Sequence, residues 1–339
     1  MREPSFWWSE GSFASALLAP LAAVYGIVAQ WRLGRAGRRA GVPVICVGNL
    51  TVGGAGKTPT ALALARMLAA AGERPVFLSR GYGGALAGPL LVDPARHRAR
   101  EVGDEPLLLA RTAPTIVARD RVKGAGIAGD ASVIVMDDGF HNPSLVKDFS
   151  VLVVHGRHGI GNGRLIPAGP LRAPLDAQLT RAHALIVVGG LGRAAAIAER
   201  ARAAAIPVLQ ARLRADAGVI AWLSARRVLA FAGIGDPDKF FATLAEAGVA
   251  LAATRSFPDH HRYTRAEAIA LCDDADGAGL VLMTTEKDLA RLSGEDRVKE
   301  LAGRAKALPV TLAFEDEEDV KSLLLKSLAR RTDDGARRG

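Results

Sequence analysis

The sequence predicts an α/β fold built on a parallel sheet, with a second, smaller α/β domain and an N-terminal helix. Three observations lead to this prediction. A short apolar, β-branched run, Val42–Val47, is followed by a glycine-rich loop and then by a strong helix former, Thr60–Ala71. Another apolar run, Pro75–Ser79, comes directly after that helix, so the order is strand, helix, strand. Further apolar runs of strand length alternate with helix-forming segments along the rest of the 339 residues.

The remaining elements continue this alternation. Strands are expected at runs rich in Val, Ile and Leu, namely Thr115–Ala118, Ser132–Met136, Val151–Val154, Ala184–Val188, Arg227–Phe231 and Leu280–Thr284. Helices are expected where Ala, Leu and charged residues predominate, namely Leu191–Ala205, Pro237–Ala247 and Glu286–Leu292. Both halves of the chain therefore belong to the α/β class.

The glycine-rich loop after the first strand is typical of a phosphate-binding loop. Its eight residues are Thr51, Val52, Gly53, Gly54, Ala55, Gly56, Lys57 and Thr58. Glycines let backbone N–H groups turn toward phosphate oxygens, and the following helix adds its N-terminal dipole. Lys57 can reach the β- and γ-phosphates, and the Thr58 hydroxyl can bind Mg²⁺. Thr51 replaces the usual first glycine, but the ending and the context predict ATP and Mg²⁺ in a P-loop NTPase-like domain.

Acidic residues that could complete a magnesium site occur in two places. The apolar run Val133–Met136 ends in Asp137 and Asp138, and P-loop proteins place an acidic residue at such a strand end. Adjacent side chains on a strand point to opposite faces, so only one of the pair is expected to serve the metal directly. Glu105, which follows Asp104, is a further candidate, although this acidic pair alone equally predicts a helix N-terminus.

A polar cluster at Asp259, His260 and His261 could supply a general base. An Asp beside a His can tune the imidazole to take a proton from a hydroxyl nucleophile. A metal site is less favoured, because no cysteine pair or second His cluster accompanies it. The two cysteines, Cys46 and Cys272, lie far apart and fit buried positions in a reducing compartment.

The N-terminal region and the overall charge predict contact with an anionic membrane surface. The run Gly11–Trp31 carries no charge, is flanked by aromatic residues and is followed by Arg32 and three further arginines before position 40. An in-plane helix, a spanning helix and a core helix all fit its length, and in the first two the arginine side faces the cytoplasm. The formal charge is +9, but no nucleic-acid-binding motif occurs, so nucleic acid is not an expected partner.

Seven segments together resemble the tetraacyldisaccharide 4′-kinase family of Gram-negative bacteria. They are VGNLTVGGAGKTP, LSRGYGG, VGDEPLLLA, VMDDGF, GNGRLIPAGPLR, FPDHHRY and MTTEKD, in family order. The resemblance implies transfer of the ATP γ-phosphate to the 4′-hydroxyl of tetraacyldisaccharide 1-phosphate, a lipid A precursor, at the cytoplasmic face of the bacterial inner membrane. It also implies a catalytic dyad of Asp104 and His260, or of its neighbour His261. Our hypothesis for the mechanism is that Asp104 accepts the hydroxyl proton with the help of His260.

The predicted organisation has three parts. Residues 1–40 hold the membrane-associated helix, residues 41–150 form the P-loop nucleotide-binding domain, and residues 151–330 form the second α/β domain with the substrate cleft. The alternative function is a switch or partitioning-type P-loop ATPase at the membrane. That class carries an additional Lys in the loop, at the position of Val52 here. The sequence also departs from the family pattern at His155 and Ala173, where acidic residues are usual.

Overall fold

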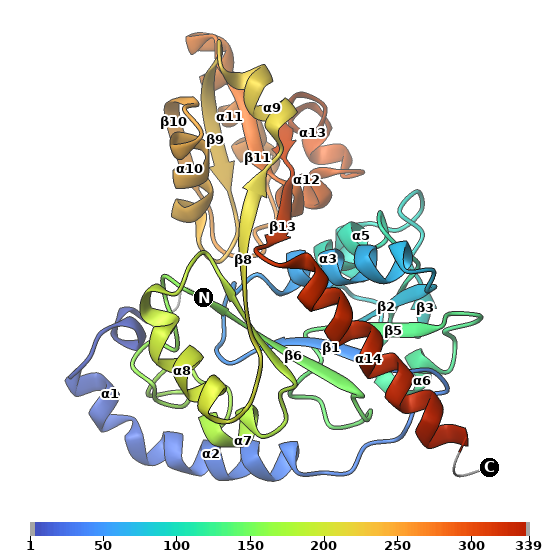
Figure 1. Cartoon of the computed structure of the whole chain (residues 1–339). Coiled ribbons are helices and arrows are strands. Elements are labelled where there is room, and N and C mark those ends of the chain that lie inside the picture. Colours follow the sequence, from blue (N-terminus) through green and yellow to red (C-terminus); the bar gives the residue numbers. More distant parts are fainter. Residues whose placement is uncertain (1–3, 337–339) are drawn as a thin grey trace.

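The computed structural model describes residues 4–336, within which the larger of two sheets has nine strands (Figure 1). Its central strand, β1 (Val44–Asn49), is buried along its whole length. The strand order is β13-β8-β7-β6-β1-β5-β2-β4-β3. The other strands are β2 (Pro75–Ser79), β3 (Leu90–Leu91), β4 (Thr115–Val117), β5 (Val133–Asp137), β6 (Phe149–His155), β7 (Ala184–Val188), β8 (Val208–Ala215) and β13 (Val310–Phe314). All neighbours pair in parallel except β3 with β4 and β13 with β8.

Helices cover both faces of this sheet and enclose an apolar core on each. One core packs α3 (Lys57–Ala70) and α14 (Glu317–Ala336) against the strands through Leu64, Leu68 and Leu324. The opposite core includes α8 (Ala195–Ala203). The shorter helices of this lobe are α4 (Ala99–Val102), α5 (Asp104–Leu109), α6 (Arg121–Ala125) and α7 (Leu175–Leu179). Burial of strands on both faces explains why their sequences are continuous apolar runs.

The second lobe is a four-stranded parallel sheet with helices around it. Its strand order is β10-β9-β11-β12. The strands are β9 (Arg227–Ala232), β10 (Ala250–Ser256), β11 (Val281–Thr285) and β12 (Lys306–Leu308). The helices are α9 (Ala217–Leu223), α10 (Pro237–Glu246), α11 (Arg265–Ala278), α12 (Glu286–Leu292) and α13 (Lys299–Arg304).

Two antiparallel strands connect the lobes. The chain leaves the first lobe along β8 and returns along β13, with Ala215 opposite Val310 (Figure 1). The change of sheet therefore falls after β8 and does not coincide with the predicted division at residue 150. The reason is that β6 pairs with β1, so the runs after residue 150 continue the first sheet. An apolar run shows that a strand is buried, but it does not show which sheet the strand joins.

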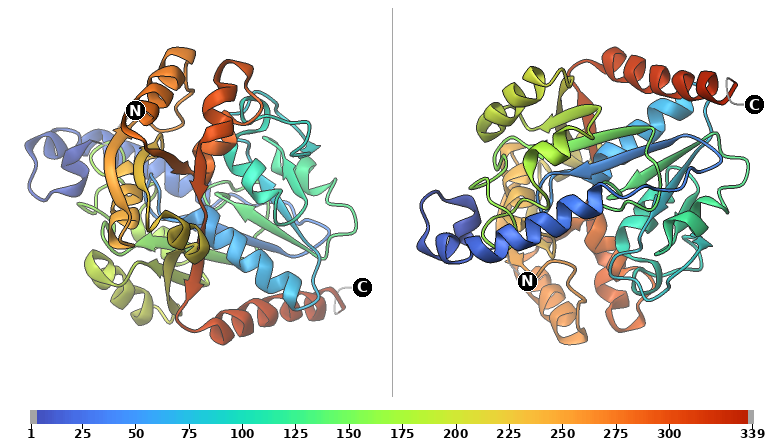
Figure 2. Two further views of the ribbon diagram at one scale, coloured as in Figure 1. Left: turned by 90° about the horizontal axis from the view of Figure 1, so that it is seen from above. Right: turned by 90° about the horizontal axis from the view of Figure 1, so that it is seen from below.

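The N-terminal residues form a 3₁₀ turn (Ser5–Trp8) and two helices, α1 (Phe13–Leu17) and α2 (Ala19–Leu33). Seen from below, α2 crosses in front of the strands of the first lobe (Figure 2). Large apolar side chains are exposed on both helices, namely Phe13, Leu17, Leu21, Val24, Ile27, Val28 and Trp31. Among residues 4–336, every helix is too short or too polar to traverse a bilayer.

Candidate functional site

The phosphate loop joins the end of β1 to the start of α3, as predicted. Gly53 and Gly56 have φ angles of 94° and 97°, a region that glycine adopts without steric cost. The Asn49 amide donates to the Gly53 carbonyl at 3.2 Å and ties the loop to the strand end. Lys57 is the first residue of α3, so its ammonium group stands where the helix N-terminus faces the loop.

Strand register brings Asp137 to this loop. Val47 lies opposite Asp137 in the β1–β5 pair, and the Thr58 hydroxyl donates to Asp137 Oδ2 at 3.0 Å. The other oxygen, Oδ1, is buried and has no hydrogen-bond partner among residues 4–336. Burial, reinforced by the neighbouring Glu105, raises the pKa of Asp137 to about 7. A buried carboxylate oxygen without a donor, beside a threonine hydroxyl, has the chemistry of a magnesium ligand.

Asp138 lies beside Asp137 but serves a different group. Its φ is 52°, and Arg172 donates to its Oδ1 at 2.7 Å and to Asn49 Oδ1 at 3.0 Å. Lys57 Nζ lies 3.9 Å from Asp138 Oδ2. Burial alone would raise the pKa of Asp138, but Lys57 and Arg172 lower it to about 2. Of the two aspartates, Asp137 is therefore the one that contacts Thr58, and Asp138 positions cations.

Arg172 also links this cluster to the N-terminal helices. Arg172 ends the loop formed by residues 161–172. The Ser15 hydroxyl donates to the Ala168 carbonyl of this loop at 2.6 Å, and the Tyr25 hydroxyl donates to the Arg172 carbonyl at 3.0 Å. Ala173, at the position where an acidic residue was expected, is fully buried. The segment thus supports α1 and α2 on one side and Asp138 on the other.

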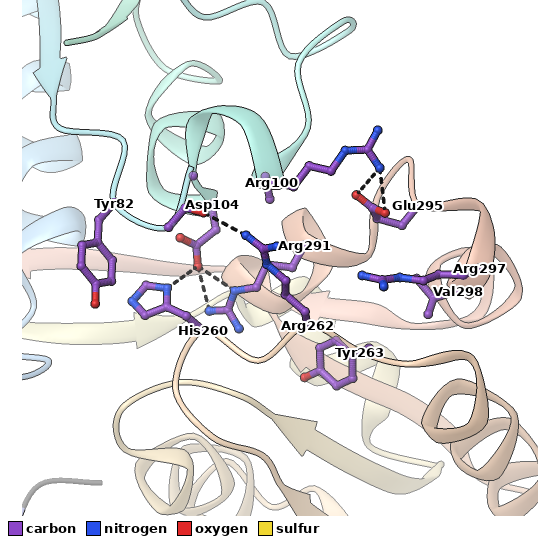
Figure 3. A pocket seen from close by; sticks show the side chains of 13 residues that line it. Tyr82, Arg100, Asp104, His260, Arg262, Tyr263, Arg291, Glu295, Arg297 and Val298 are labelled. Carbon is purple, nitrogen blue, oxygen red and sulfur yellow. Dashed lines mark hydrogen bonds and ion pairs between the residues drawn. The ribbon is translucent and has the colours of Figure 1, made fainter. Parts of the chain in front are cut away.

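Asp104 and His260, which are 156 positions apart in the sequence, meet between the lobes (Figure 3). Asp104 begins α5 in the first lobe, and His260 lies in the loop after β10 in the second. His260 Nδ1 is 3.5 Å from Asp104 Oδ2, and the side chains are 28% and 3% exposed. The contact with Asp104 raises the pKa of His260. Burial opposes ionisation of Asp104, but His260 and Arg291 outweigh it and hold the pKa of Asp104 well below its usual range.

The position of Asp104 depends on a close backbone approach. The preceding Gly103 has φ 93°, and a Cβ there would lie 2.6 Å from the Tyr82 carbonyl oxygen. The Gly-Asp-Glu-Pro segment is therefore packed directly against the Ser-Arg-Gly-Tyr-Gly-Gly segment that follows β2. Tyr82 in turn places its ring 5.0 Å from the His260 ring. Two loops singled out in the sequence thus form one wall of the site.

His261 faces away from Asp104. Its Nε2 lies 2.9 Å from Glu267 Oε2, and its ring stacks on Phe257 at 4.9 Å between centroids. Glu267 belongs to the capping box that begins α11, so His261 helps to fix that helix end. From the sequence, either His260 or His261 could be the partner of Asp104, and of the two only His260 lies next to Asp104.

Glu105 and Arg291 add contacts between the lobes. Lys287 Nζ donates to Glu105 Oε1 at 2.6 Å, so the predicted metal ligand Glu105 is engaged by a cation. Arg291 donates through Nε to Asp104 Oδ2 at 2.8 Å. Sequence reasoning did not find Arg291, since it follows the Met-Thr-Thr-Glu-Lys-Asp segment and no spacing reveals a partner so distant in the chain. Within residues 4–336, no group of three or more His, Cys, Asp or Glu residues could hold a metal.

Two cavities adjoin this region, and both lobes line each of them. One, of about 430 Å³, meets the phosphate loop at residues 51–55 and includes His155, His158 and Asp259. The other, of about 270 Å³, is lined by Asp104, His260 and several arginines (Figure 3). The sequence predicted that residues 151–330 form the substrate cleft, and both of these cavities lie between the lobes.

Comparison with known proteins gives consistent matches over nearly the whole chain. A family model described as tetraacyldisaccharide-1-P 4′-kinase matches residues 14–329. A tetraacyldisaccharide 4′-kinase of Bradyrhizobium sp. (strain BTAi1) is 53% identical over 331 residues, covering 97% of this chain and 96% of that protein. One of Nitrobacter winogradskyi is 53% identical over 332 residues, covering 97% and 98%. A crystal structure of LpxK from Aquifex aeolicus in complex with ATP superposes with a TM-score of 0.72 at 28% identity, covering 93% and 99%.

Proposed function

Because this chain belongs to the tetraacyldisaccharide-1-P 4′-kinase family, we propose that it transfers the γ-phosphate of ATP to the 4′-hydroxyl of a tetraacyldisaccharide 1-phosphate, a lipid A precursor. One observation supports this most directly. A phosphate loop with Thr58 and Asp137 side by side, and a carboxylate–imidazole pair, both border the space between the lobes. The phosphate loop with Thr58 and Asp137 has the groups that bind a nucleotide, and the carboxylate–imidazole pair can take a proton from an acceptor hydroxyl.

At the nucleotide end, the loop amides and Lys57 would bind the β- and γ-phosphates. We propose that Thr58 and Asp137 hold Mg²⁺, since Asp137 Oδ1 is the buried oxygen without a donor. Magnesium in kinases commonly takes one or two carboxylates and fills its shell with phosphate oxygens and water, so a cluster of three acidic residues is not required. When bound, the ion neutralises charge on the phosphates. Glu105 would act on this site through its charge, which already influences Asp137.

At the acceptor end, we propose that His260 takes the hydroxyl proton and Asp104 orients the ring. Asp104 is almost wholly buried, and its oxygens already face Arg291, His260 and the Glu105 amide. His260 is the more exposed partner, and with Nδ1 turned to Asp104 its Nε2 faces Asp259 Oδ2 at 3.8 Å, a longer contact that a substrate hydroxyl would replace. This assignment reverses the roles in the hypothesis drawn from the sequence. The geometry of hydrogen bonding favours it, because a carboxylate surrounded by donors is a weak base.

We propose that α1 and α2 hold the protein on the cytoplasmic face of the inner membrane. The acceptor carries acyl chains, and these helices expose seven large apolar side chains. Arg32 follows in the last turn of α2, and Arg35 lies over the Trp31 ring at 5.3 Å. Apolar residues with adjacent arginines suit an in-plane helix on anionic lipid.

The test of the activity is transfer of label. The purified chain is incubated in detergent with γ-labelled ATP, Mg²⁺ and tetraacyldisaccharide 1-phosphate, and label on the lipid is measured. We expect transfer that depends on Lys57 and on His260. ATP hydrolysis at the same rate without lipid, and no labelled lipid, would contradict the proposal and favour a switch-type ATPase.

The test of membrane attachment is flotation with vesicles that contain anionic phospholipid. Replacing Ile27, on the outer surface of α2, by Glu should reduce the bound fraction. Ile269, on the surface of α11 and also exposed, provides the matched control, and Ile269→Glu should bind as well as the unmodified chain. Equal binding of both variants would argue against attachment through α2.

A further inference from the structure

We infer that Arg291 is a positioning residue for phosphoryl transfer, because it fixes the Asp104 carboxylate against His260 from the opposite lobe. This inference rests on the proposed kinase activity. Arg291 lies on α12 in the second lobe, whereas Asp104 begins α5 in the first. Figure 3 shows the guanidinium beside the carboxylate, on the side not occupied by the imidazole.

The contacts of Arg291 use all three of its nitrogen atoms. Nε donates to Asp104 Oδ2 at 2.8 Å, and Nη2 forms an ion pair with the same oxygen at 2.7 Å. Nη1 donates to the Gly233 carbonyl at 2.7 Å and to Asp288 Oδ1 at 2.8 Å. A planar guanidinium held on two sides has little rotational freedom, so it fixes the direction from which Asp104 is bound.

The anchor behind Arg291 is itself fully buried. Asp288 is completely inaccessible, and its Oδ1 also accepts from the Tyr263 hydroxyl at 2.8 Å and the Gly233 amide at 3.0 Å. The Thr285 hydroxyl donates to Asp288 Oδ2 at 2.6 Å. Tyr263 belongs to the loop that carries His260, so one network holds both Arg291 and the chain segment of the imidazole. The network explains the acidic end of the Met-Thr-Thr-Glu-Lys-Asp segment, which the proposed chemistry does not use.

Charge and burial make this pair different from an ordinary surface ion pair. The Arg291 side chain is 7% exposed and Asp104 is 3% exposed. Without Arg291, Asp104 would keep His260 and the charge of Lys287, which is itself paired with Glu105. A buried carboxylate that loses a directly bound cation is disfavoured. The carboxylate would then turn toward solvent or take up a proton. Either change would remove the acceptor that orients His260.

A second ion pair between the same lobes provides a matched control. Arg100 Nη1, in α4, lies 3.1 Å from Glu295 Oε2 in the second lobe, and the Arg100 side chain is 57% exposed. It bridges the lobes as Arg291 does, but it does not touch Asp104 or His260. An effect of general lobe docking should appear in both arginine variants, whereas an effect on the dyad should appear only at Arg291.

The first experiment compares Arg291→Ala, Arg291→Lys and Arg100→Ala for kcat with the lipid acceptor, KM for ATP and Tm. Removing a charge-assisted bond should lower kcat of Arg291→Ala about 10- to 100-fold while KM for ATP stays the same. Arg291→Lys keeps the positive charge but lacks the planar group of three nitrogens, so kcat should still fall. The change in Tm should be smaller than in Arg291→Ala. Arg100 lines the same cavity but contacts neither Asp104 nor His260, so kcat of Arg100→Ala should fall much less than kcat of Arg291→Ala.

Chemical rescue separates positioning from a structural role. Arg291 lines the cavity of about 270 Å³, so a small cation can reach the space left by Arg291→Ala. Guanidinium chloride at millimolar concentration should raise kcat of this variant, whereas urea, which has a similar shape and no charge, should not. Folded Arg291→Ala with unchanged kcat, an equal loss in Arg100→Ala, or identical effects of guanidinium and urea would overturn the inference. Absence of lipid labelling by the unmodified chain would instead contradict the proposed function.

Discussion

The phosphate loop is assembled by neighbouring strands of one sheet, whereas the Asp104–His260 pair is assembled across two lobes. At the loop, β1 and β5 pair in parallel and end at the same edge, and the loop after β1 leads directly to Thr58 of α3, which contacts Asp137. At the pair, each residue comes from a different lobe, and the contact is supported by ion pairs such as Lys287 with Glu105. From this difference we expect that substitutions can impair nucleotide binding and acceptor activation separately.

The largest effect should follow from removing Lys57 at the nucleotide end. Without its charge on the β- and γ-phosphates, kcat should fall about 10³-fold or more in Lys57→Ala. Lys123, an exposed lysine of α6, serves as control, and Lys123→Ala should transfer label normally. Labelled lipid formed at a near-normal rate by Lys57→Ala would contradict the role of the loop in binding the nucleotide.

A slightly smaller effect is expected at the acceptor end. Asp104→Asn keeps the shape of the side chain but removes the charge that orients His260, so kcat should fall about 10²-fold. The affinity for ATP, measured by calorimetry, should stay the same, because Asp104 is not part of the loop. A parallel loss of ATP affinity would mean that the two regions are not separable.

The next prediction concerns magnesium. Asp137→Asn leaves the hydrogen bond from Thr58 possible but weakens the proposed ligand. The Mg²⁺ concentration for half-maximal rate should therefore rise about 10- to 100-fold. Asp138→Asn should change that concentration much less, since Asp138 is bound by Arg172. Titration of the rate with MgCl₂ in both variants measures the difference, and the opposite ranking would assign the metal to Asp138.

The smallest effect is a dependence on pH. It is measured in Asp137→Asn as well as in the unmodified chain, because Asp137, with its pKa raised to about 7, also titrates in this range. His260 must be neutral to take a proton, and its pKa lies above the ordinary value of 6.5 because of Asp104. The rate constant kcat/KM should therefore be level at higher pH and fall about tenfold per unit as pH drops below that pKa. Asp104 stays ionised throughout this range. A rate that is level from pH 8 down to pH 5 would point to Asp104 as the acceptor.

The same comparison explains what could be predicted from the sequence. The phosphate loop depends on residues that are adjacent in the chain and on a strand–loop–helix order, so spacing was sufficient to predict it. The pairing of Asp104 with His260 followed only from the family resemblance, because it depends on how the lobes pack. Arg291 was missed for the same reason. Membrane attachment of the N-terminal helix stays a prediction.

Secondary structure shows a similar division. Buried strands such as β2 and β7 have the predicted bounds, since their runs are continuously apolar. The bounds of β10 were not predicted, because most of its residues are exposed and its sequence is rich in Ala. β8 was missed because Arg212 and Arg214 interrupt its apolar residues and only Ala211 is fully buried. Strands with exposed faces give a weak signal, and their positions depend on tertiary pairing.

The paired strands β8 and β13 have a consequence for how the chain could be divided. Because Ala215 lies opposite Val310, the chain leaves the first lobe and returns to it at neighbouring points. The second lobe is therefore arranged as a domain inserted into the first. Residues 216–309 could be excised and replaced by a tight turn without separating any two strands of the nine-stranded sheet. The remainder would keep the phosphate loop, Asp137 and α14, but it would lack His260 and Arg291.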